Sequence, residues 1–183
     1  LRHAWVNGRG CIARFDRMAI EIRVLDVQET PFADVAIHSA IAASLRALCQ
    51  MGSAAQARLR ALDTSSLAEI LRATTREAER TQIVDTRYLS ALGFDAQPRC
   101  ASDLWCELLE RDFAHDPLYT ALRTPLDVIR DEGTLSTRIL RRLRAHATGR
   151  GSPSSTPNRE SLGLVYLELA DCLRDGRMLR APS

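Results

Sequence analysis

The polarity pattern of the chain changes near residue 29, and this change restricts the folds that are open to it. Residues 11–15 and 19–25 are extended in character, and in the second segment apolar residues alternate with Glu21 and Arg23. Alternation with a period of two is typical of a strand, because successive side chains point to opposite faces. The apolar members of the alternation are Ile20, Ile22 and Val24. We therefore expect residues 16–18 to join two antiparallel strands whose apolar face is buried.

From Thr30 onward the pattern is helical. Thr30 followed by Pro31 is a typical helix start, because Thr caps free backbone N–H groups and Pro fits the first helical position. The expected helices span residues 31–50, 66–82, 102–113, 126–130, 134–146 and 161–174. Residues 148–158 are rich in Gly, Ser and Pro, which predicts a flexible loop. These patterns predict one α+β domain over residues 1–183, with a sheet portion at 1–28 and a mainly helical portion at 29–183.

Composition argues against several classes of protein. A net charge of +2 favours neither a nucleic-acid partner nor an anionic membrane, and we find no apolar run that approaches a membrane span. Every basic residue is Arg, so an anion must be held by Arg, His or backbone N–H groups. The five cysteines form no CxxC pair, which predicts a reducing, cytoplasmic setting. The chain does not begin with Met, and we expect residues before Leu1.

Glu21 and Arg23 are the residues whose chemistry is most informative. They lie two apart in the expected strand and therefore share a face. A carboxylate is a hard ligand suited to Mg²⁺, and a guanidinium donates two parallel hydrogen bonds to phosphate oxygens. Arg14 and Arg17 lie just upstream, where they extend the same anion site. The alternative is an ordinary solvated ion pair on the outer face of a strand.

The same region resembles a known family of enzymes. The matching stretches are WVNGRG at residues 5–10, RFDR at 14–17, IEIRVLDVQE at 20–29 and PFADVAI at 31–37. Weaker similarity follows at residues 85–89, 101–105 and 135–140. Together these segments are similar to the bacterial type 2 glutamate–cysteine ligases, also called carboxylate–amine ligases. The resemblance covers most of the chain and is most specific in its first 37 residues.

The resemblance implies a fold, a reaction and a set of site residues. The fold would be that of glutamine synthetase, in which a curved antiparallel sheet lines a cavity for ATP, metal ions and an amino acid. Glu21 would be a Mg²⁺ ligand, and Arg23 a catalytic contact to the transferred γ-phosphate. Arg14 and Arg17 would lie near the nucleotide phosphates. The substrates would be glutamate and an amine such as cysteine, joined through an acyl phosphate as in glutathione biosynthesis.

Two departures from the family pattern change the expectation. Met18 stands where a small residue, often Gly, is typical of the family. Members of the family are also much longer, so this chain corresponds to their C-terminal portion. We therefore expect it to be incomplete and inactive when it is alone.

Two other classes of function remain open from the sequence. One is a helical interaction module that retains the strand as a relic and binds a partner through uncovered apolar surface. The other is a nucleic-acid binder that uses a basic run on the helix expected at residues 134–146. This run comprises Arg138, Arg141, Arg142 and Arg144. We favour a solvated helix face for it, opposite the apolar stripe. Self-association into a homo-oligomer is left open.

Overall fold

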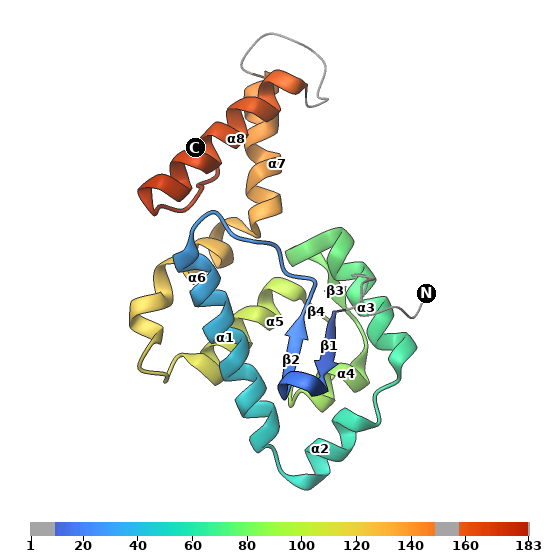
Figure 1. Cartoon of the computed structure of the whole chain (residues 1–183). Coiled ribbons are helices and arrows are strands. Elements are labelled where there is room, and N and C mark those ends of the chain that lie inside the picture. Colours follow the sequence, from blue (N-terminus) through green and yellow to red (C-terminus); the bar gives the residue numbers. More distant parts are fainter. Residues whose placement is uncertain (1–9, 149–157, 183) are drawn as a thin grey trace.

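The computed structural model describes residues 10–148 and 158–182. Within that part of the chain two separate two-stranded antiparallel sheets accompany a larger set of helices, so the predicted α+β class is confirmed (Figure 1). Residues 5–9 of the family resemblance, and residues 149–157 of the expected loop, lie outside the described residues.

The predicted hairpin is present and we call it the ribbon. It consists of β1 (Cys11–Arg14), the 3₁₀ turn η1 (Phe15–Arg17), β2 (Ala19–Ile22) and the next residue, Arg23. Its strands are antiparallel, with Cys11 opposite Ile22 and Arg14 opposite Ala19. β2 ends three residues earlier than the expected strand, although the N–H of Arg23 still donates to the carbonyl of Gly10 at 2.9 Å. Met18 adopts the left-handed conformation with φ 50°, which explains why Gly suits this position.

The expectation that the apolar face of the ribbon is buried is wrong. Ile20 is 62% exposed and Ile22 is 41% exposed, whereas the Arg23 side chain on the opposite face is only 11% exposed. The two strands contact each other extensively, while the side chains on their apolar side remain exposed. The charged face can turn inward because its cations and carboxylates pair with one another, which reduces the desolvation cost.

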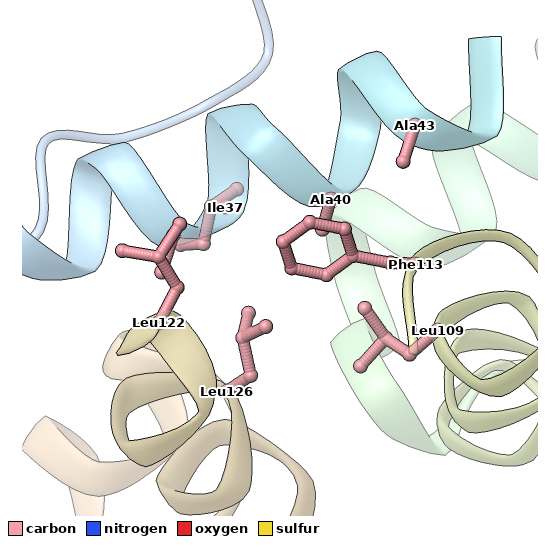
Figure 2. Close-up of a cluster of buried hydrophobic side chains, with 8 residues drawn as sticks. Ile37, Ala40, Ala43, Leu109, Phe113, Leu122 and Leu126 are labelled. Carbon is pink, nitrogen blue, oxygen red and sulfur yellow. The ribbon is translucent and has the colours of Figure 1, made fainter. Parts of the chain in front are cut away.

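α1 begins as the sequence predicts and supplies much of the core. It spans Pro31–Gln50, and the Thr30 hydroxyl accepts the N–H of Ala33 at 3.1 Å. Its buried face packs against α6 and η3, as Figure 2 shows. The helix is nevertheless long and apolar enough to cross a membrane by length and composition, so the expectation that no segment approaches that length is wrong. Its buried residues make it a core helix of this fold.

The remaining elements follow the predicted helical pattern with several differences. They are α2 (Ser53–Arg60), α3 (Thr64–Glu77), η2 (Ala78–Arg80), β3 (Gln82–Ile83), α4 (Thr86–Ala91), β4 (Arg99–Cys100), α5 (Ala101–Leu108), the π-helical turn η3 (Leu109–Phe113), α6 (Tyr119–Glu132), α7 (Leu135–Thr148) and α8 (Arg159–Asp175). The sequence pattern did not predict α2, α4 or the sheet formed by β3 and β4, and the helix predicted over residues 66–82 runs past the end of α3. The prediction also began the corresponding helix at Leu126, directly after Pro125, whereas α6 begins at Tyr119. Pro125 instead lies inside α6, where burial in the core offsets its missing N–H.

α7 and α8 form a helical pair that projects from the rest of the fold (Figure 1). The expectation that the basic run of α7 lies on a solvated face is wrong for Arg138, which is 0% exposed. Arg138 instead forms a fully buried ion pair with Glu29, the residue that precedes the N-cap of α1. The helical period shows which side of α7 carries Arg138. It does not show that Glu29 and Leu179, which are distant in sequence, cover that side.

Candidate functional site

Three charged side chains of the ribbon form an ion-pair network on its inner face. The Arg14 Nη1 donates to Glu21 Oε2 at 2.8 Å, across the two strands. The Arg23 Nε lies 3.1 Å from Glu21 Oε1, so each carboxylate oxygen faces one guanidinium. The prediction that Glu21 and Arg23 share a face is therefore confirmed. The Glu21 carboxylate thus lies between two guanidinium groups, and the paired strands β1 and β2 hold this arrangement.

The turn of the ribbon adds a second, more exposed group of charges. The Arg14 Nε donates to Asp16 Oδ1 at 3.2 Å, and the Arg17 Nε lies 3.6 Å from Asp16 Oδ2. Arg17 therefore joins the group through Asp16 and does not contact Glu21 directly. Three guanidinium groups face two carboxylates along this surface, which leaves a positive balance suited to an anion.

The charges alter the protonation behaviour of the ribbon. The hydrogen bond from Arg14, helped by the positive charge of Arg23, lowers the pKa of Glu21 although partial burial opposes it. The hydrogen bond from Arg14 also lowers the pKa of Asp16, and both carboxylates raise the pKa of Arg14. Both carboxylates therefore remain ionised at neutral pH, which is required of a residue that binds a cation.

We expect the ribbon network to weaken in acid. Because the pKa of Glu21 is lowered from an ordinary value of 4.5, its ion pairs contribute fully above about pH 4.5 and are lost as the pH falls through the lowered pKa. A carbon-detected NMR titration of the Glu21 carboxyl checks this. Arg14→Gln should return the pKa toward its ordinary value, whereas Arg58→Gln on α2 should not change it. An unchanged Glu21 pKa in Arg14→Gln would contradict the ion pair.

A groove begins where the ribbon ends. It has a volume of about 770 Å³ and is lined by residues 24–28 together with parts of α1, α3, η2, α5, α6, α7 and α8. Its lining is mainly apolar and includes Leu71 and Trp105. Glu21 and Arg23 are not among the lining residues; they lie on the adjoining ribbon, three residues and one residue before the first lining residue, Val24. The structure thus brings the predicted charged pair beside the groove without placing it inside.

Glu79 is a groove residue that the sequence pattern did not predict. Its carboxylate accepts from the hydroxyl of Thr137 at 2.7 Å, from the hydroxyl of Thr134 at 3.1 Å and from the backbone N–H of Thr134 at 3.4 Å. Burial raises the pKa of Glu79, but the hydrogen bonds from Thr137, from its own backbone and from Thr134 outweigh that effect and leave the pKa lowered. Glu79 therefore caps the N-terminus of α7. No local pattern marks it, because its partners lie more than 50 residues away.

The ribbon fits a phosphate group better than a free metal ion. Among residues 10–148 and 158–182 no three His, Cys, Asp or Glu side chains gather into a metal-binding group. Glu21 supplies one carboxylate, and both of its oxygens face guanidinium groups. Mg²⁺ commonly keeps one or two protein carboxylates and takes other ligands from water and substrate phosphates. Both Glu21 oxygens are already paired with guanidinium groups, so its predicted role as a Mg²⁺ ligand stays a prediction.

Comparisons with known proteins add one partial similarity. A segment of 43 residues is 54% identical to part of an uncharacterized protein of Archaeoglobus fulgidus, and it makes up 24% of this chain and 12% of that protein. No family model matches the chain, and no solved structure matches it. The shared segment carries no activity over to this chain, whose chemistry is inferred from its own residues.

Proposed function

We propose that this chain contributes the phosphate-binding ribbon of an ATP-dependent carboxylate–amine ligase of the glutamate–cysteine ligase type. The observation that carries the proposal is the network in which Glu21 lies between Arg14 and Arg23 on one face of the ribbon. The resemblance of this segment to the ligase family and the positive balance of the ribbon support the same role. We also propose that the ribbon belongs to the wider antiparallel sheet of a glutamine synthetase-like fold.

The proposed reaction has two steps. The γ-carboxylate of glutamate attacks the terminal phosphorus of ATP, which forms an acyl phosphate and releases ADP. The amine, such as that of cysteine, then attacks the acyl carbon, which forms the amide and releases phosphate. The charge that spreads over the transferred group favours fixed cations nearby.

Each ribbon residue has a distinct part in this proposal. Arg23 contacts the transferred phosphate, and its shielded position strengthens that contact because little water competes. Arg14 and Arg17 hold the other nucleotide phosphates. Glu21 holds a Mg²⁺ ion, whose chemistry when bound is to neutralise and orient the phosphate oxygens. Glu21 also keeps the two guanidinium groups of Arg14 and Arg23 in place before the nucleotide arrives.

Binding of Mg·ATP to the whole chain tests the proposal. We expect NMR resonances of residues 11–23 to shift with a dissociation constant on the order of 1 mM, because only part of a two-substrate site is present. Arg23→Gln should weaken the response about tenfold, since it removes a charge-assisted contact to phosphate. The matched control is Arg46→Gln, at an exposed ion pair on α1. Equal responses in both variants would contradict the ribbon site.

A second function, an interaction module, is favoured by the outer face of the ribbon. Phe15 is 87% exposed and Met18 is 94% exposed, and the apolar face that they adjoin is uncovered among the described residues. Exposed strand edges and apolar faces favour association. We expect the chain to self-associate with rising concentration in light-scattering chromatography. A double variant, Phe15→Ser with Ile20→Thr, should be less associated. A chain that is monomeric at every concentration would contradict self-association through this face.

A further inference from the structure

The segment that follows the ribbon joins it to the start of α1. The strands pack chiefly on each other, and residues 24–28 run along the groove toward α1. The N–H of Gln28 donates to the Asp34 carboxylate at 3.0 Å. One residue later the Glu29 side chain is fully buried, which makes it the first deeply anchored residue after the ribbon.

Glu29 is held by a polar cluster that we call the clasp, which consists of the Glu29 and Arg138 side chains and the backbone of Leu179. Glu29 Oε1 accepts from Arg138 Nη1 and from the N–H of Leu179, the latter at 3.1 Å. Arg138 Nη1 also donates to the Leu179 carbonyl at 2.6 Å, and Arg138 Nε donates to the Gly133 carbonyl at 3.1 Å. The clasp thus joins the end of the ribbon segment, α7 and the C-terminal segment.

The C-terminal segment, residues 177–182, is also anchored directly after the clasp residue Leu179. The Arg142 Nε donates to the Arg180 carbonyl at 2.9 Å. The Glu132 carboxylate accepts from the Ala181 N–H at 2.5 Å and pairs with the Arg180 Nε at 2.8 Å. Leu179 itself is buried. The C-terminal segment therefore supplies the Leu179 backbone groups that bind Glu29 and Arg138.

A fully buried ion pair is a poor choice for stability alone. Apolar residues of similar volume commonly stabilise a fold as well or better, because desolvating two charges is costly. Glu29 Oε2 and Arg138 Nη2 also have no hydrogen-bond partner among the described residues, which adds to that cost. Hydrogen bonds, however, are directional, whereas apolar contacts are not. The clasp is therefore better suited to fixing one orientation than to maximising stability.

We propose that Glu29, Arg138 and the backbone of Leu179 are positioning groups that set the direction in which the ribbon leaves the helical body. The consequence for nucleotide binding rests on the proposed function, because Glu21 and Arg23 are carried by that ribbon. The proposed role of the clasp in placing the ribbon does not depend on the proposed function. The clasp also couples the C-terminal segment to the ribbon across 150 residues of sequence, so loosening one loosens the other.

Hydrogen exchange of the whole chain without nucleotide tests the clasp. In the double variant Glu29→Met with Arg138→Met, the buried volume is kept and the directional bonds are lost. We expect amide exchange at residues 19–30 to rise about tenfold, while α2–α4 and the core of α1 keep their protection. The matched control replaces an exposed helical ion pair, Arg123→Met with Asp127→Met, and should leave the ribbon unchanged. A ribbon with unchanged exchange in the clasp variant overturns the proposal.

A second variant keeps the test decisive if the double variant fails to fold. Arg138→Lys retains a charge for Glu29 but cannot reach Glu29, Gly133 and Leu179 at once, because Lys lacks the planar fork of Arg. The same rise in exchange at residues 19–30 is expected, and its absence overturns the proposal. This measurement uses no nucleotide, so it tests the clasp independently of the phosphate site. If the ribbon loosens in the variants but the native chain does not bind Mg·ATP, the clasp proposal stands and the phosphate site is contradicted.

Discussion

Arg138→Met is expected to lower the free energy of unfolding by about 3–5 kcal/mol, because it leaves the Glu29 carboxylate buried without its cation. Both side chains are 0% exposed, so water cannot replace the lost partner without opening the fold. The measurement is urea unfolding followed by circular dichroism. Arg76→Met, at an exposed position on α3, is the control and should change the free energy by less than about 0.5 kcal/mol.

The double variant separates charge burial from packing. Glu29→Met combined with Arg138→Met removes both charges, and we expect it to recover most of the stability that the single variant loses. The recovery would be measured in the same urea experiment. Two outcomes would contradict this account of the pair: a single variant as stable as the native chain, or a double variant less stable than the single one.

Phe113→Ala is expected to cost about 3–5 kcal/mol of stability, because it opens a cavity in the main core. Phe113 is 0% exposed and packs with Leu109, Leu122 and Leu126 against α1 (Figure 2). Its ring also meets the ring of Tyr119 edge to face, with centroids 5.5 Å apart. Thermal and urea unfolding both report the loss, and a lower midpoint with an unchanged urea slope is expected.

The matched control for Phe113 is an exposed phenylalanine, Phe15. Phe15, at the turn of the ribbon, is almost fully exposed, so Phe15→Ala removes the same atoms from a site that buries few of them. We expect its stability to stay within about 0.5 kcal/mol of the native chain. Equal losses in the two variants would mean that the ribbon turn is covered in solution, which would favour the interaction module.

The elements predicted best are those whose signals are local. The start of α1 followed from Thr30 and Pro31, because a cap and a fixed φ angle act within one helical turn. The ribbon followed from alternation with a period of two. The short elements α2, α4 and β3–β4 were missed, because an element of a few residues is too short to show a clear polarity period. α6 was shortened in the prediction at Pro125, whose tolerance inside the helix depends on the surrounding core.

The candidate site shows the same division. The spacing of Glu21 and Arg23 determined that they share a face, and their contact follows from that spacing. Arg14 joined them because strand pairing places β1 beside β2. Which face turns inward was predicted wrongly, because that choice depends on what covers each face. Glu79 was missed because its hydrogen-bond partners are distant in sequence.

The sequence by itself therefore determined the α+β class, the ribbon, the longer helices and the shared face of Glu21 and Arg23. These depend on backbone hydrogen bonds and side-chain periods that connect residues close along the chain. Only the tertiary structure decided the exposure of the apolar ribbon face, the groove beside it and the burial of Arg138. Burial is a property of contacts between distant segments, as Glu29, Arg138 and Leu179 demonstrate, and no local pattern encodes which segments will meet.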